Sequence, residues 1–133
     1  MPDTPHIDTL RSPLGRARGL GSARAGSKHW WAQRVTSLAL VPLTLWFIWS
    51  VLHLTGASQG DVAAWLASPV RLALLLALIG ATFHHLQLGL QVVIEDYVTH
   101  EGMKLASVLV VKGLCILLAL ICAISALTIG LSS

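Results

Sequence analysis

Three long apolar runs constrain this chain more than any other feature of its sequence. The runs cover residues 35–54, 70–94 and 105–131. A helix rises about 1.5 Å per residue, so about 20 apolar residues are enough to cross the hydrocarbon of a bilayer. Each run is therefore long enough to span once. The sequence predicts an all-α integral membrane protein with three transmembrane helices, over about 33–54, 70–96 and 104–131.

The composition supports a membrane protein. Of the 133 residues, 55% are hydrophobic and only 11% are charged, whereas a soluble domain carries about 25% charged residues. The formal charge of +3 does not indicate nucleic-acid binding, because most basic residues cluster ahead of the first apolar run. The cysteines, Cys115 and Cys122, both lie in the last run, and we interpret them as packed apolar side chains rather than a metal or redox pair.

The first 29 residues differ in character from the rest. They are rich in Gly, Ser, Pro and Arg and show no apolar period, which predicts a flexible basic arm over 1–29 ahead of a membrane domain over 30–133. Residues 55–69 are expected to form a short polar loop, with an interfacial turn around Trp65. Basic residues flank the arm end of the first run and the far end of the second, but the 55–69 loop has none. The positive-inside rule therefore predicts a cytoplasmic N-terminus.

The second apolar run ends in a stretch, 84–97, that carries polar residues at unusual depth. Eleven residues separate His85 from Asp96, which is about three helical turns and leaves the two side chains about 20° apart around the axis. Along the axis, His85 lies about 16 Å deeper than Asp96, and His84 points about 100° away from His85. A buried imidazole and a near-surface carboxylate, with Tyr97 beside it, are thus predicted to share one helix face.

Ionisable side chains inside spanning helices are costly, which makes His85 a candidate functional residue. A neutral imidazole can be an axial ligand of haem iron, or it can hydrogen-bond to a neighbouring helix. Gly89 lies one turn from His85 on the same face and would admit either a flat macrocycle or a close helix. The residues alone leave both interpretations open. One histidine supplies one axial position, so the second ligand of a six-coordinate haem would come from another chain.

Further polar groups lie where the predicted helices reach the membrane–water interface. Arg34, at the start of the first helix, is either a positive-inside anchor or a partner for a carboxylate such as a haem propionate. Glu95 and Asp96 place two acids at a helix carboxyl end, where the helix dipole disfavours them. Tyr97 can anchor at the headgroups or donate a hydrogen bond to a quinone carbonyl.

Two motifs resemble those of a known family. The start of the small membrane anchor of succinate dehydrogenase resembles residues 29–36 of this chain, which read HWWAQRVT and precede a spanning helix. The second-helix signature of that family, in its alphaproteobacterial and mitochondrial branch, is similar to the spacing of His85, Gly89, Asp96 and Tyr97. The resemblance covers roughly residues 13–133, and this spacing is its specific part. His84 is an extra histidine that the signature does not explain.

The resemblance implies a subunit of respiratory complex II, the succinate:quinone oxidoreductase. In that family a flavoprotein oxidises succinate, an iron–sulfur protein carries the electrons, and two membrane subunits hold a b-type haem and the quinone site. This chain would be a non-catalytic anchor and electron-transfer subunit in a bacterial inner membrane, or alternatively a mitochondrial inner membrane. It would form half of a haem-binding helical bundle that it shares with a second cytochrome b subunit.

The resemblance also implies roles for individual residues. His85 would be the axial ligand to the haem iron, Arg34 would lie near a haem propionate, and Gly89 would belong to the same haem site. Asp96 and Tyr97 would border ubiquinone. Two alternatives are a quinol:fumarate reductase of the same architecture, and a non-redox three-helix assembly or channel subunit in which the histidines only form hydrogen bonds.

Overall fold

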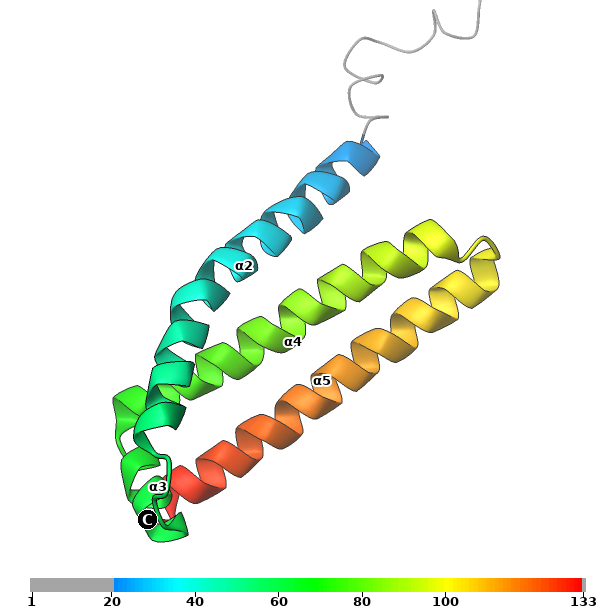
Figure 1. Ribbon diagram of the computed structural model, residues 1–133. Helices are drawn as coiled ribbons and strands as arrows, with labels where there is room; N and C mark the ends of the chain where they lie inside the picture. The colour runs from blue at the N-terminus through cyan, green and yellow to red at the C-terminus, as the bar shows by residue number, and fades with distance from the viewer. Residues whose placement is uncertain (1–20, 133) are drawn as a thin grey trace, which may run out of the picture. The chain divides into compact units, whose positions relative to one another are not determined.

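The computed structural model describes residues 21–132, with side chains from residue 27 onward. These residues form four helices and no strand: α2 (Gly21–His53), α3 (Gln59–Leu66), α4 (Pro69–Tyr97) and α5 (Glu101–Leu131) (Figure 1). Three segments are long and apolar enough to cross a membrane, namely Ser27–His53 within α2, the whole of α4 and the whole of α5. The predicted all-α fold with three membrane-spanning helices is confirmed.

The first spanning helix begins earlier than expected. Of the arm predicted over 1–29, residues 1–20 lie outside the described residues, and residues 21–29 are helical rather than irregular. No proline occurs between Pro13 and Pro42, so no missing N–H interrupts the backbone hydrogen bonds there. The turns of α2 up to Ala32 belong to one structural unit. The chain from Gln33 onward forms another, which contains the rest of α2 and all of α3, α4 and α5.

The segment expected to be a polar loop contains the short helix α3. The Ser58 hydroxyl accepts a hydrogen bond from the backbone N–H of Asp61 (3.2 Å), and the Asp61 carboxylate accepts one from the backbone N–H of Ser58 (3.1 Å). This reciprocal capping box starts the helix. Hydrogen bonds to the Asp61 carboxylate, first from the Ser58 hydroxyl and then from the Ser58 backbone, lower the pKa of that carboxyl group. Gly56, with φ of 82°, makes the turn between α2 and α3, a conformation that glycine adopts without strain.

Helices α4 and α5 pack along each other as an antiparallel hairpin, joined by residues 98–100 (Figure 1). The hydrophobic core lies where α3, the start of α4 and the end of α5 meet, around Leu66, Leu72 and Ala126. Gly130 allows the close approach, since a Cβ atom there would lie 3.1 Å from the Leu66 carbonyl oxygen and 3.2 Å from a Leu72 methyl group.

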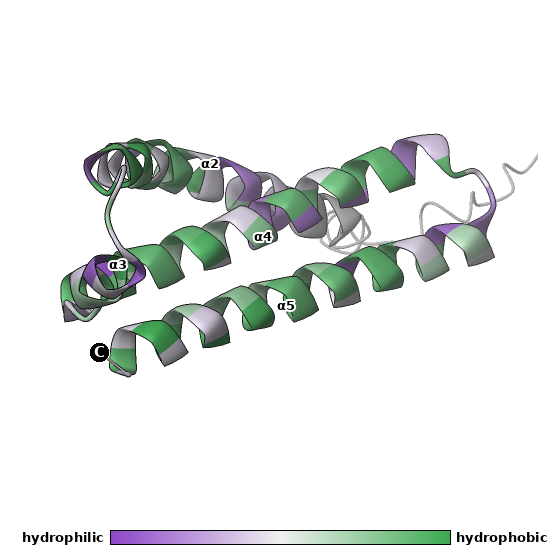
Figure 2. Cartoon of the chain, turned by 60° about the horizontal axis from the view of Figure 1, so that its bottom comes forward, coloured by the Kyte–Doolittle hydropathy of each residue, from purple (hydrophilic) through white to green (hydrophobic). Residues whose placement is uncertain are grey.

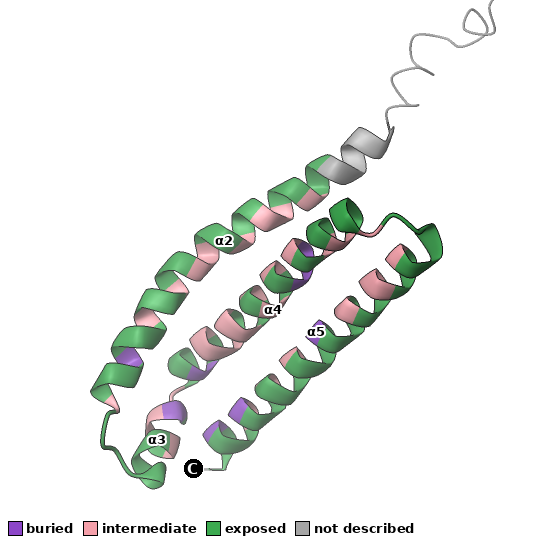
Figure 3. Ribbon diagram, turned by 45° about the vertical axis from the view of Figure 1, so that its right-hand side comes forward, coloured by how far each residue is buried: buried purple, intermediate pink, exposed green. Residues whose placement is uncertain are grey.

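Most apolar side chains of the three long helices are exposed. Hydrophobic residues cover α4 and α5 between their ends, and few residues in the described part are buried (Figures 2 and 3). The buried hydrophobic residues are Leu66, Leu72, Leu88, Cys115 and Ala126. Such a surface would be insoluble in water, but it is what helices surrounded by lipid or by other membrane subunits require.

Candidate functional site

The His85 imidazole contacts two polar side chains of α2. Its Nδ1 lies 3.0 Å from the Thr36 hydroxyl, and its Nε2 lies 3.5 Å from the Gln33 side-chain nitrogen. The Thr36 hydroxyl also donates to the backbone carbonyl of Gln33, at 3.1 Å. Gln33 and Thr36 are three residues apart and therefore share one face of α2. Both ring nitrogens of His85 thus have partners, and both partners come from the first spanning helix.

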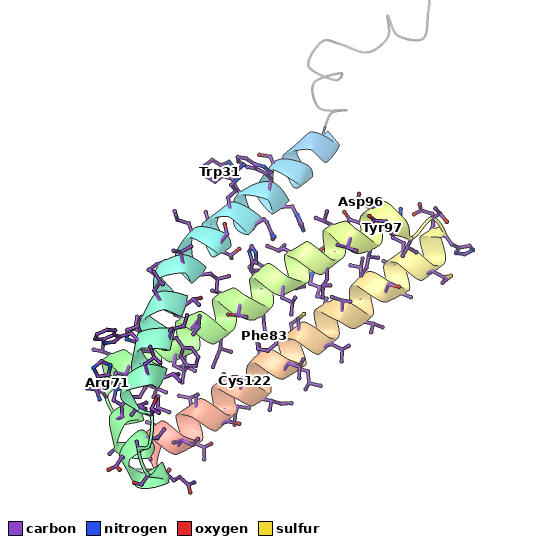
Figure 4. All side chains as sticks on the ribbon, in the orientation of Figure 1. Trp31, Arg71, Phe83, Asp96, Tyr97 and Cys122 are labelled. Carbon is purple, nitrogen blue, oxygen red and sulfur yellow. The ribbon has the colours of Figure 1, made fainter. Side chains whose placement is uncertain are left out.

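His84 lies on a different side of α4. It lines a partly open cavity of about 310 Å³ between α4 and α5, together with Phe83, the buried Gln87 and, from α5, the buried Cys115. Figure 4 shows Phe83 on α4 and Cys122 on α5. The two adjacent imidazoles therefore face different helices, α5 for His84 and α2 for His85. The structure confirms the predicted divergence of the two rings.

Gly89 and the His85 ring share one neighbour, the Gln33 side-chain nitrogen. A Cβ atom at Gly89 would meet only the Gln33 side-chain nitrogen, at 3.7 Å. The space over Gly89 and next to His85 Nε2 is therefore taken by one flexible polar side chain. The Gln33 side-chain oxygen is buried and has no hydrogen-bond partner, so this placement leaves a desolvated carbonyl unpaired.

These features fit a haem with one axial ligand from this chain. An imidazole at membrane depth, a glycine on the same face and a displaceable side chain between them are what a flat macrocycle needs. Within residues 27–132 no group of three or more His, Cys, Asp or Glu side chains could hold a metal ion.

Arg34 lies in the turn of α2 that reaches His85. It follows Gln33 directly and precedes Thr36 by two residues, and its side chain is exposed. The Ser37 hydroxyl donates to the Arg34 backbone carbonyl at 2.8 Å. The turn of α2 that carries Arg34 thus also carries Gln33 and Thr36, the two residues that contact His85.

Asp96 and Tyr97 form the last turn of α4 (Figure 4). Tyr97 is 82% exposed and Asp96 is exposed. The other acid of this turn, Glu95, accepts a hydrogen bond from Gln91 at 2.8 Å. Within the described part of the chain, neither Asp96 nor Tyr97 has a side-chain partner, so both are available to a ligand or another subunit.

Comparison with known proteins identifies the family. A family model described as the succinate dehydrogenase/fumarate reductase transmembrane subunit matches residues 8–128. The chain belongs to this family. Its membership confirms the resemblance seen in the sequence, and the chain is a membrane anchor subunit rather than a catalytic one.

Several curated relatives of the anchor family come from alphaproteobacteria. The succinate dehydrogenase hydrophobic membrane anchor subunit of Rickettsia bellii is 34% identical over 103 residues, which is 77% of this chain and 82% of the relative. The protein of the same name from Rickettsia conorii is 31% identical over 80% of this chain and 86% of its own length. That of Paracoccus denitrificans is 29% identical over 90% of this chain and 93% of its own length. No solved structure matches the chain.

Two residues at this site of the anchor subunit were not singled out by the sequence. Gln33 and Thr36 lie within the segment that resembles the family, but only the structure brings them to His85, across 52 and 49 residues of sequence. One signal was available, since two polar side chains three residues apart near the start of a spanning helix mark a face that needs a polar partner.

Proposed function

We propose that this chain anchors the flavoprotein and iron–sulfur subunits of a succinate:quinone oxidoreductase to the bacterial inner membrane. Together with a second cytochrome b subunit, it would hold haem b and form the ubiquinone-reduction site. The observation that carries the proposal is the position of His85. It lies near the middle of α4, one turn before Gly89, and its ring contacts Gln33 and Thr36 of α2. The names of the relatives, which are succinate dehydrogenase anchor subunits, support the choice of complex.

At the haem site, the His85 imidazole would bind the iron, together with a residue of the partner subunit. Gly89 would leave room for the macrocycle, and Arg34 would neutralise a propionate with charge-assisted hydrogen bonds. A haem bound there supplies a one-electron redox centre in the membrane. The contribution of this chain is to orient the His85 imidazole and, through the surrounding apolar helices, to exclude water from it.

At the quinone site, Tyr97 donates a hydrogen bond to a ubiquinone carbonyl, and Asp96 orients water for proton delivery. Reduction of a quinone to a quinol takes two electrons and two protons, so the site must reach both an electron donor and water. The exposure of both side chains at the end of a spanning helix supports this assignment. With the N-terminus cytoplasmic, as the basic flanks indicate, this end of α4 faces the cytoplasm, where the soluble subunits dock.

Adjacent histidines provide a matched test of the haem assignment. In the purified complex, His85→Ala should remove or shift the haem b absorption bands and change the haem midpoint potential. The neighbouring variant His84→Ala should leave both unchanged, since that ring faces α5. Unchanged bands and potential in His85→Ala would refute the assignment and favour a non-redox three-helix subunit.

The family description also covers fumarate reductases, so the reverse reaction is the second candidate function. The two functions separate when the purified complex is assayed in both directions with a high-potential and a low-potential quinone. Faster succinate oxidation with ubiquinone supports the proposed direction. Faster fumarate reduction with a low-potential quinol supports the alternative.

A further inference from the structure

His85, Thr36 and Gln33 form a closed cycle of three polar contacts. The His85 Nδ1 lies 3.0 Å from the Thr36 hydroxyl, the Thr36 hydroxyl lies 3.1 Å from the Gln33 carbonyl oxygen, and the Gln33 side-chain nitrogen lies 3.5 Å from His85 Nε2. The first two distances are those of good hydrogen bonds, whereas the third lies at the outer limit.

The direction of each hydrogen bond follows from the chemistry of its partners. A backbone carbonyl can only accept, so the Thr36 hydroxyl donates its single proton to the Gln33 carbonyl. The Thr36 oxygen is then left with lone pairs and can only accept from His85. Since the facing atom is Nδ1, this nitrogen must carry the ring proton. The Gln33 side-chain N–H group can in turn donate only to an Nε2 that has a lone pair. All three contacts are satisfied by one tautomer of a neutral imidazole.

We propose that Thr36 is a positioning residue that holds His85 as the Nδ1–H tautomer and presents the Nε2 lone pair as the ligand atom. This inference rests on the proposed haem ligation. It adds that the ligand atom is selected within this chain, before any iron is bound. Gln33 is the side chain that must leave Nε2, and its long contact and unpaired buried oxygen show that it is weakly held there.

Thr36 would therefore affect both the orientation of the His85 ring and the strength with which Nε2 donates electrons to a metal. A ring N–H that donates to an oxygen makes the opposite nitrogen a stronger electron donor and fixes the rotation of the ring. Removing such a partner typically weakens metal affinity by about 10–100-fold. A stronger donor also favours the oxidised iron, so loss of the Thr36 hydroxyl should raise the midpoint potential.

The first experiment measures the tautomer of His85 in the chain without haem. The full chain is prepared in detergent without haem and with ¹⁵N-labelled histidine, and the His85 signals are assigned by their loss in His85→Gln. We expect a protonated Nδ1 in the wild type and in Thr36→Ser, which keeps the hydroxyl. We expect the Nδ1–H form to lose its dominance in Thr36→Val, which has nearly the same shape without the hydroxyl. A protonated Nε2 in the wild type, or no change in Thr36→Val, would overturn the proposal.

The second experiment measures haem loss and the haem midpoint potential in the purified complex. Thr36→Val should lose haem about 10–100-fold more readily on dilution or competition and should show a higher midpoint potential, and Thr36→Ser should restore both. Thr44→Val, which removes a hydroxyl farther along α2, serves as the control and should change neither. If His85→Ala alters the haem but Thr36→Val does not, the role of Thr36 is wrong and the haem assignment stands. If His85→Ala has no effect either, the proposed haem ligation itself fails.

Discussion

Gly130 offers a direct test of how the end of α5 packs. Adding one methyl group, in Gly130→Ala, places a Cβ atom 3.1 Å from the Leu66 carbonyl oxygen and 3.2 and 3.3 Å from the two Leu72 methyl groups. The Leu72 side chain can rotate away. The Leu66 oxygen belongs to the backbone at the end of α3, so the backbone of α3 or of α5 must shift by a few tenths of an ångström to relieve that contact.

The expected size of the effect is the difference between two terms. Alanine is favoured over glycine in a helix by about 1 kcal/mol. Overpacking a close contact costs about 1–3 kcal/mol. At Gly113, in the same helix, an added methyl group would have nothing within 4 Å. Gly113→Ala therefore gains the helix propensity of alanine without the cost of overpacking. The two variants should therefore differ by about 1–3 kcal/mol in the free energy of unfolding, with Gly130→Ala the less stable.

Unfolding of the purified chain in mixed micelles, driven by a rising fraction of sodium dodecyl sulfate, measures this difference. Tryptophan fluorescence is a suitable signal because Trp65 packs against the cluster that includes Leu66. Trp65 also stacks on Trp46, with ring centroids 6.0 Å apart, so separation of α3 from its neighbours changes its environment. Equal stability of Gly130→Ala and Gly113→Ala, or greater stability of Gly130→Ala, would refute the close approach of α5 to α3.

Three further predictions concern single side chains. Tyr97→Phe should slow quinone reduction by the complex while sparing electron transfer from succinate to a soluble dye, and equal loss of both activities would indicate misassembly instead. Cys122, which is exposed, should react with a membrane-permeant maleimide in detergent faster than the buried Cys115, as peptide mass spectrometry can measure. The lowered pKa of Asp61 means that its carboxylate stabilises the fold above the usual carboxyl pKa of about 3.9. That contribution is lost as the pH falls through the lower folded-state value, so hydrogen exchange in α3 should rise at acidic pH, and Asp61→Asn should remove this pH dependence.

The features that the sequence predicted well are those that depend on neighbouring residues. The three spanning helices follow from the length of uninterrupted apolar runs. The divergence of His84 and His85 follows from 100° of rotation per residue. Neither feature needs knowledge of any other helix, which is why the structure agrees with both.

The features that the sequence missed mostly depend on how the helices pair. The spacing of Gln33 and Thr36 indicates a polar face on α2, but the register of α2 against α4 decides that this face meets His85. The close approach at Gly130 likewise depends on where α5 meets α3. The helix α3 is different, since Ser58 and Asp61 stand at capping-box spacing and this local signal was available.

The interval between His85 and Asp96 restricts how α4 can evolve. Deleting one residue between His85 and Asp96 would rotate the end of the helix by about 100° and shorten it by about 1.5 Å. The carboxylate would then leave the face that carries the histidine. Insertions and deletions should therefore accumulate in the segment from Gly56 to Ser58, whereas the eleven-residue interval should change only by substitution.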